Sequence, residues 1–156
     1  MTAPIMVSTR TLPDGSTILL SLVADGLSNR EIGRKLNVTP KAVDRQLQYL
    51  MRALGVHSRF ALVAWAYRTR ILERVPCGPH GPQQTERRVE VLRHVLAGET
   101  DAEIAQALGI GPNGVRKHLR VLYHQLKARN RSQLLRFAVD SGLVQVGDPA
   151  AETGAP

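Results

Sequence analysis

The sequence predicts an all-α protein made of two tandem four-helix domains, each containing a helix-turn-helix. A shift of 72 residues aligns residues 19–72 with 91–144 without a gap, and most matched positions are apolar. Their three- and four-residue spacing is typical of helices that share a buried stripe. Aromatic residues make up only 4% of the chain, so small aliphatic cores are expected. We therefore expect one domain over 12–72 and a second over 84–144.

Turn and capping residues place the first two helices of repeat one. The turn residues of 12–15 predict a first helix over about 16–24, which the glycine at position 26 would close. Ser28 and Glu31 then form a capping box, in which each side chain satisfies the backbone amide of the other. A second helix should follow over about 29–36.

Repeat two carries the same device 72 residues later. Thr100 and Glu103 form the second capping box and predict a helix over about 101–108. Because two independent capping boxes occupy matching positions, the prediction of both second helices does not depend on the hydrophobic pattern alone.

The third helices carry basic residues. In the stretch 111–127, Pro112 suits a first helical turn, and the apolar residues fall on one stripe. Arg116, Lys117 and Arg120 project from the opposite side. Such a helix fits the major groove of DNA, although a single basic helix is also compatible with an ordinary solvated face. The repetition of the pattern favours the first interpretation.

The ends of the third and fourth helices follow from their flanking residues. Thr39 is a better N-cap for the third helix than Gly111, its counterpart in repeat two. The third helix of repeat one should end near Leu54 and Gly55. Fourth helices are expected over about 58–70 and 130–141.

A set of matched residues leads to a known family. Repeat two contains Thr85, Arg87, Glu90-Val91-Leu92, Gly98, Glu103-Ile104-Ala105, Val115-Arg116-Lys117-His118, Arg131 and Ala138. Repeat one keeps Leu12, Gly26, residues 28–32, Val43, Leu54-Gly55-Val56, Arg59, Leu62-Val63 and Ala66. In this pattern each repeat resembles the LuxR/GerE-type helix-turn-helix domain of bacterial transcription regulators, which is also found in NarL/FixJ-like response regulators.

The resemblance and the charge pattern together imply contacts with double-stranded DNA. The candidate residues lie on or beside the two recognition helices: Arg116, Lys117, His118, Arg120, Asn113, Thr100 and Arg131 in repeat two, and Lys41, Arg45, Gln48, Arg52 and Arg59 in repeat one. Repeat one departs from the family at Asp44, where a base-reading residue such as lysine is usual, and at Gln46, which replaces a histidine. Repeat two is therefore expected to be the main sequence reader.

Charge supports a polyanionic partner for both repeats. The chain carries a net charge of +8, with a sequence pI of about 10.5. Residues 19–72 contain nine basic and three acidic residues, a net of +6, and residues 84–144 contain ten and six, a net of +4. Repeat one is thus expected to keep affinity for the DNA backbone even where its sequence reading is weakened.

The fourth helices are the expected contact between the repeats, because members of the resembled family commonly pair through this helix. Trp65, with Ala61 and Ala64 beside it, would face outward, and Phe137 holds the equivalent position in repeat two. Alternatively, Trp65 covers the core of its own repeat. The linker over 73–83 reaches at most roughly 36–40 Å, enough for half-sites about 34 Å apart.

Other functional classes find little support. Cys77 and His80 lie in the linker with metal-like spacing, but a site needs about four ligands. The five histidines are scattered, so neither an enzyme nor a cofactor is expected, and no small-molecule ligand either. No apolar run approaches a membrane span or a signal peptide, which predicts a cytoplasmic protein. A disordered tail is expected over 145–156.

The sequence thus predicts a bacterial transcription regulator that binds DNA as an intramolecular pseudo-dimer without a sensor domain. Its activity would be set by abundance or by a partner protein. The alternative is an interaction module, in which repeat two binds DNA while repeat one binds RNA polymerase, a sigma factor or another regulator.

Overall fold

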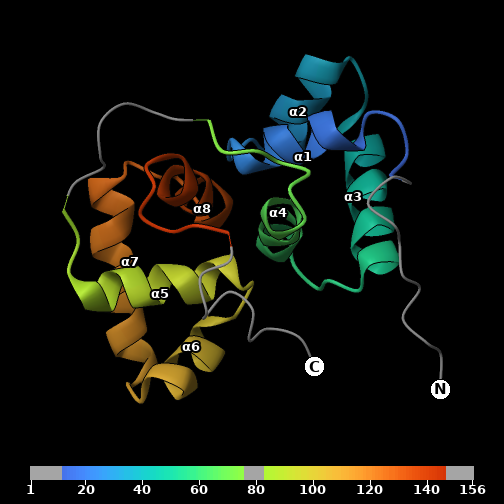
Figure 1. Ribbon diagram of the computed structural model, residues 1–156. Helices are drawn as coiled ribbons and strands as arrows, with labels where there is room; N and C mark the ends of the chain where they lie inside the picture. The colour runs from blue at the N-terminus through green and yellow to red at the C-terminus, as the bar shows by residue number, and fades with distance from the viewer. Residues whose placement is uncertain (1–11, 76–82, 147–156) are drawn as a thin grey trace, which may run out of the picture.

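A computed structural model describes residues 12–75 and 83–146, and within these ranges the chain forms eight helices and no strand (Figure 1). The helices of repeat one are α1 (Ser16–Ala24), α2 (Asn29–Leu36), α3 (Pro40–Leu54) and α4 (Arg59–Arg68). Those of repeat two are α5 (Glu86–Leu96), α6 (Asp101–Leu108), α7 (Pro112–Gln125) and α8 (Arg131–Asp140). The predicted all-α class is confirmed.

Local sequence explains most helix boundaries. Both capping boxes are formed, and Thr39 caps α3 by accepting from the Ala42 amide N–H at 3.1 Å. As expected, Gly111 provides no side-chain cap for α7. Helix α1 also starts without a side-chain cap, after Gly15 in the left-handed region, and it is two residues shorter than α5.

The fourth helices end slightly earlier than predicted. The hydroxyls of Thr69 and Ser141 bond back to the carbonyl oxygens of the preceding turn, at 2.8 Å to Trp65 and 2.6 Å to Phe137. The next residues, Arg70 and Gly142, adopt positive φ angles of 58° and 73°, which stop the helix. The sequence does not indicate that an arginine adopts this conformation. For this reason the expected range of the first fourth helix, 58–70, is longer than α4.

The two repeats pack together with approximate two-fold symmetry. Helices α4 and α8 lie against each other at the centre (Figure 1), α1 packs on α8, and α5 packs on α4 in the symmetry-related position. Beside this axis, Gly98 lies next to Ala61. The equivalent residues after the shift of 72, Gly26 and Gln133, also lie next to each other. The contact is therefore isologous in form, although one chain supplies both halves.

The hydrophobic core is continuous across the repeats. Its largest fully buried side chains come from both halves and join one cluster: Leu20, Ile32, Leu50, Leu62, Leu92, Leu96, Ile104, Leu122, Leu134 and Leu135. Repeats of this size are near the lower limit for a self-sufficient core. Burial between the repeats therefore supplies part of the stability of each.

On each side of the contact between the repeats, an arginine of a fourth helix binds the end of the other repeat's first helix. The two arginines occupy different positions of their helices. Arg68 donates from Nη1 to the carbonyl oxygens of Leu96 (3.0 Å) and Ala97 (2.5 Å) at the end of α5. On the other side, Arg136 pairs with Asp25 at the end of α1 and with Asp140 at 3.3 Å. The symmetry-related counterparts of Arg136 and Asp25 are Ala64 and Ala97, both buried.

The edges of the linker and the tail are more ordered than the sequence suggested. The Val75 amide N–H donates to Asp140 Oδ1 at 3.0 Å, and Arg74 Nε donates to the Asp140 carbonyl oxygen at 3.2 Å. Val146 packs against the core. Residues 73–75 and 145–146, expected to belong to the linker and tail, are therefore attached to the domains by polar and apolar contacts that their composition does not reveal.

We predict that Arg136→Ala destabilises the protein by about 2–3 kcal/mol. The Asp140 side chain is only 7% exposed, and without the guanidinium its carboxylate would be left with the Val75 amide alone. Urea unfolding followed by circular dichroism measures the effect. Arg120→Ala, which removes an exposed arginine from α7, is the control and should change stability by less than about 0.5 kcal/mol. Equal losses for the two variants would contradict the assignment.

Candidate nucleic-acid interface

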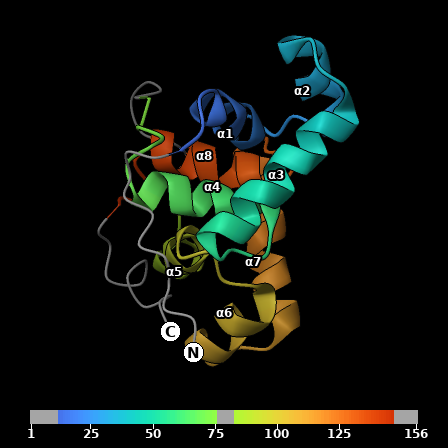
Figure 2. The same ribbon diagram turned by 90° about the vertical axis from the view of Figure 1, so that its right-hand side faces the viewer.

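Each repeat contains two short helices joined by a tight turn. The turn after α2 passes through Asn37 (φ 55°), and the turn after α6 passes through Gly109 (φ 62°), both left-handed. In Figure 2, α2 and the start of α3 lie at the upper right, and α6 and α7 at the lower right. The two helix-turn-helix units therefore face the same side of the molecule.

Close packing fixes the angle of the first turn. A Cβ placed on Gly33 would lie 2.7 Å from the carbonyl oxygen of Val38 and 3.3 Å from the Pro40 nitrogen. Gly33 is buried in α2, so no side chain fits between the two helices at this point. The backbone of the turn therefore lies directly on α2, and α3 starts from a fixed position.

Helix α7 separates an apolar from a basic face. Val115, Leu119 and Leu122 are buried, whereas Arg116, Lys117, Arg120 and Asn113 are exposed and His118 is half-buried. Within the described residues, Arg116, Lys117 and Arg120 make no hydrogen bond or ion pair, so their charged groups are available to a ligand. Arginine and lysine side chains match the phosphate oxygens and the major-groove edge of guanine.

Helix α3 presents a different outer face. Asp44 accepts a hydrogen bond from Gln48 Nε2 at 2.8 Å and a longer one from Asn29 Nδ2 at 3.5 Å. The amide of Gln48 is thus already paired. The cations that remain exposed on this helix are Lys41, Arg45 and Arg52, while Gln46 is half-buried. Positive charge is therefore interrupted in the middle of α3, where α7 has Arg116.

Arg59 and Arg131 hold the helices together rather than facing outward. Arg59 donates to Asn29 Oδ1 at 2.6 Å and to the Leu27 carbonyl oxygen at 2.5 Å. Burial lowers the Arg59 pKa, and the charge of Asp44 acts in the opposite direction. Arg131 donates to Asp101 Oδ1 at 2.5 Å and to the Glu99 carbonyl oxygen at 2.7 Å. Both guanidinium groups have internal partners and are therefore not part of the exposed basic surface.

The environment of Arg59 accounts for Asp44. In repeat two, Asp101 gives Arg131 a carboxylate partner, but the equivalent residue in repeat one is the neutral Asn29. Asp44 supplies the missing negative charge nearby, at the position that Arg116 occupies in repeat two. The departure from the family pattern therefore places a negative charge near Arg59 and interrupts the positive charge on the outer face of α3.

Two further expectations concern Thr100 and the pair formed by Cys77 and His80. The Thr100 hydroxyl is used by its capping box, at 2.7 Å from Glu103 Oε2. The same contact lowers the pKa of Glu103, through the hydrogen bonds it accepts from Thr100. Cys77 and His80 lie outside the described residues, and within 12–75 and 83–146 no group of three or more potential metal ligands is found.

The residues expected between the repeats occupy varied environments. Ala64 is fully buried, whereas Trp65 and Phe137 are half-buried. Trp65 packs against the common core. Ala61 lies opposite Gly98 of the other repeat, 3.7 Å from the position of a Cβ there. Sequence reasoning did not single out Arg68, Arg136 or Asp25, because their roles depend on the relative placement of the repeats.

A recurrent pair of short helices, the second basic and exposed, defines a helix-turn-helix protein. Comparison with known families agrees: the pattern of the bacterial regulatory proteins of the luxR family matches residues 17–66 and again 83–138. The chain belongs to this family, which comprises DNA-binding regulators and not enzymes. None of the helices in the described ranges has the length and apolar character needed to cross a membrane.

Several curated proteins resemble single stretches of the chain. Regulatory protein SdiA of Escherichia coli (strain K12) is 35% identical over 60 residues, which cover 38% of this chain and 25% of SdiA. The putative HTH-type transcriptional regulator YhjB of the same organism is 43% identical over 47 residues, covering 30% and 24%. Oxygen regulatory protein NreC of Staphylococcus aureus (strain JH9) is 38% identical over 55 residues, covering 35% and 25%. The chain thus spans about a quarter of the length of these relatives. No solved structure matches the chain.

We predict that Gly33→Ala destabilises the protein by about 1–3 kcal/mol, although glycine to alanine normally stabilises a helix interior by about 0.5–1 kcal/mol. The added Cβ would collide with the Val38 carbonyl oxygen. Gly114→Ala in α7 is the matched control, since its Cβ would meet only the Ile110 side chain at 3.6 Å. Thermal unfolding compares the two variants. If both were stabilising, the close approach at Gly33 would not constrain the turn.

A double-mutant cycle tests the role of Asp44. Asp44→Arg should lower stability by about 1 kcal/mol, because Arg59 loses a neighbouring negative charge and Gln48 loses its acceptor. Adding Asn29→Asp recreates the arrangement of Asp101 and Arg131 and should recover most of that loss. Urea unfolding of the two single variants and the double variant measures the coupling. Strictly additive effects would show that Asp44 does not substitute for a carboxylate at position 29.

Proposed function

We propose that the chain regulates transcription by binding one duplex with both repeats, as an intramolecular pseudo-dimer. The observation that carries this proposal is the approximate two-fold packing of α4 on α8, with both helix-turn-helix units on the same side. The expected domain boundaries, 12–72 and 84–144, are part of the proposal. In this arrangement α3 and α7 would enter major grooves on one face of the DNA.

Repeat two would supply most of the sequence reading. Its recognition helix exposes three unpaired cations, Arg116, Lys117 and Arg120, whereas Asp44 interrupts the corresponding face of α3. Repeat one would add affinity through Lys41, Arg45 and Arg52, because phosphate contacts strengthen binding regardless of sequence.

The alternative is that repeat one binds RNA polymerase, a sigma factor or another regulator. A specific observation favours it: Leu36 and Val38 at the turn of repeat one are 37% and 46% exposed, while their counterparts Leu108 and Ile110 are half-buried. Exposed apolar residues suit a protein contact. They do not explain the basic charge around them, so we prefer DNA as the partner of both repeats.

Selection from random duplexes separates the two proposals. The purified chain is bound to a pool of DNA, and the enriched sequences are aligned. If the pseudo-dimer proposal is right, a single bound chain should protect two adjacent major grooves of the selected DNA, about one helical turn apart. Protection of one groove alone, together with capture of repeat one by a purified RNA polymerase, would favour the alternative.

We predict that Arg116→Ala or Lys117→Ala weakens binding to the selected site by about 1–3 kcal/mol, if the side chain contacts a base in bidentate fashion. Arg45→Ala, the equivalent change to Lys117→Ala in repeat one, is the matched control and should have a smaller effect. Fluorescence anisotropy with the selected duplex measures each affinity. The assignment of repeat two as the main reader is reversed if Arg45→Ala abolishes binding and the repeat-two variants leave it intact.

A further inference from the structure

The aromatic ring of Phe60 links the two repeats at the start of their fourth helices. Phe60 belongs to the first turn of α4, and the guanidinium carbon of Arg131, the first residue of α8, lies 4.4 Å from the centre of its ring. Phe60 is half-buried, and the Arg131 side chain is only 17% exposed. A cation is attracted to the face of an aromatic ring, more strongly where water is excluded. Next to it, Asn130 Nδ2 donates to the Gly26 carbonyl oxygen at 2.9 Å and fixes the start of α8 on repeat one.

Arg131 also holds the beginning of the helix-turn-helix unit of repeat two. Its two terminal nitrogens donate to Asp101, the first residue of α6, at 2.5 Å and to the Glu99 carbonyl oxygen at 2.7 Å. The Glu99 side chain is itself held, since its Oε2 lies 2.7 Å from His94 Nδ1. The third guanidinium nitrogen of Arg131, Nε, has no hydrogen-bond partner among the described residues. Two hydrogen bonds and the ring of Phe60 therefore set the position of this group.

The recognition helix of repeat two lies close to the same group. Tyr123 is on α7, about one helical turn after Arg120, and is half-buried. Burial raises the pKa of the Tyr123 hydroxyl, and the charges of Arg131 and Asp101 shift this pKa in opposite directions. Helix α6 in turn packs on α7. One guanidinium group thus connects α4 of repeat one with both helices of the helix-turn-helix unit of repeat two.

Repeat one lacks the equivalent link. Arg59 is the counterpart of Arg131 after the shift of 72 residues, but the counterpart of Phe60 is Ser132. A serine has no ring to place over a guanidinium group. Ser132 is also buried, which leaves no water-filled space that a larger partner could enter. The support from the other repeat therefore runs in one direction, from repeat one to repeat two.

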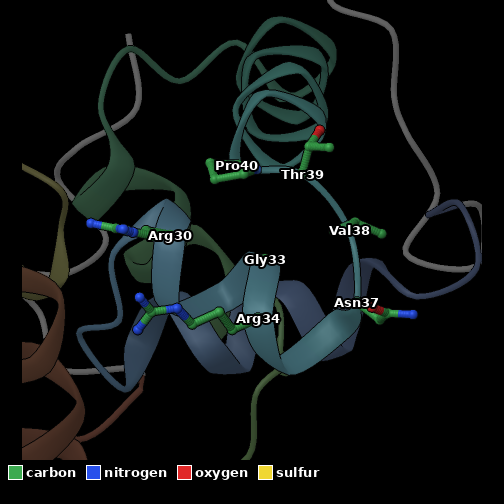
Figure 3. Close-up of a pocket in the computed structure, with 7 residues that line it drawn as sticks. All are labelled: Arg30, Gly33, Arg34, Asn37, Val38, Thr39 and Pro40. Atoms are coloured by element: carbon green, nitrogen blue, oxygen red, sulfur yellow. The ribbon is translucent and has the colours of Figure 1, made fainter.

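The helix-turn-helix unit of repeat one is fixed from within. Figure 3 shows Gly33 on α2 opposite the segment that leads through Val38 and Thr39 into α3, where a Cβ would lie 2.7 Å from the Val38 carbonyl oxygen. Repeat two has Ala105 at the position of Gly33. The two units therefore differ in what sets their geometry: close backbone packing in repeat one, and a contact from the other repeat in repeat two.

We propose that Phe60 is a positioning residue for sequence reading, through which repeat one holds α6 and α7 of repeat two in the orientation that reads bases. The inference rests on the function proposed above, in which α7 is the main reader, and adds the route by which the other repeat contributes. Phe60 acts through Arg131 and Asp101 and does not itself meet DNA. Replacing its ring should therefore loosen the reader without removing any group that contacts the duplex.

Selectivity between two duplexes measures this role in the full chain. Phe60→Leu removes the ring and keeps an apolar side chain, whereas Phe60→Tyr keeps the ring. Phe60→Leu should weaken binding to the selected duplex about fivefold. Its binding to a duplex of scrambled sequence should stay within about twofold of wild type, because backbone contacts depend less on the exact placement of α7 than base contacts do. Phe60→Tyr should restore the wild-type ratio of the two affinities. Fluorescence anisotropy measures both affinities well below the unfolding temperature of each variant.

A second variant breaks the same link from its other end. Asp101→Asn gives repeat two the residue that repeat one carries at position 29, where it is compatible with the fold. It should lower the selectivity as Phe60→Leu does. The double variant should lose little more than either single variant, because both changes act through Arg131. Phe137→Leu, the same change at the other phenylalanine, is the matched control and should keep the ratio of affinities within about twofold of wild type.

Hydrogen exchange of the full chain tests the link without DNA. In Phe60→Leu the amides of residues 104–108 in α6 should exchange about fivefold faster than in wild type, while those of 32–36 in α2 should not change. Equal acceleration in both helices, or none, overturns the proposal. So does a Phe60→Leu chain whose affinities for the two duplexes fall together or stay unchanged, as a merely structural role would give. A wild-type chain without preference for any duplex would instead overturn the proposed function, and the exchange rates would still decide whether Phe60 holds α6.

Discussion

The packing of α4 against α8 is the constraint on which the rest of the structure depends. Each repeat is close to the smallest size that can bury a core, and the two cores merge into one cluster across this contact. Because α1 also packs on α8 and α5 on α4, neither repeat can rotate without breaking apolar and polar contacts together. The positions of the two recognition helices relative to each other follow from that rigidity.

The repeats have diverged in places that the shared core does not control. Most buried positions correspond after the shift of 72 residues, although residue types differ at some, such as Ala24 and Leu96 or Tyr67 and Val139. The outer faces differ. Asp44 in repeat one corresponds to Arg116 in repeat two, and Arg30 and Arg34 correspond to Ala102 and Gln106. One of these differences lies next to an internal contact, because Asp44 places a negative charge near Arg59, whose hydrogen-bond partner is the neutral Asn29. Arg30 and Arg34 lie exposed on α2, and Arg34 interacts electrostatically with Glu31 of the same helix.

The sequence predicted the fold well because its signals are local and occur twice. Capping boxes, the proline at the start of each third helix and the shared apolar stripe placed α1, α2, α3 and α6 within a residue or two. It predicted the outer face of α7 equally well, since exposed cations on an amphipathic helix need no tertiary information. The internal partners of Arg59 and Arg131 could not be foreseen, because an arginine in a motif does not reveal which way its guanidinium turns.

The ion pair between Arg136 and Asp25 has no counterpart across the approximate two-fold axis, where the equivalent residues are the buried Ala64 and Ala97. In a dimer of identical subunits every such pair must occur twice. A chain that carries both halves can change one edge of the contact and leave the other as it was. If the second halves of two chains met instead, Arg136 would lie against Ala97, and its charge would be buried without Asp25. The single ion pair therefore favours contact of a first half with a second half over contact between two second halves, whichever molecules supply them.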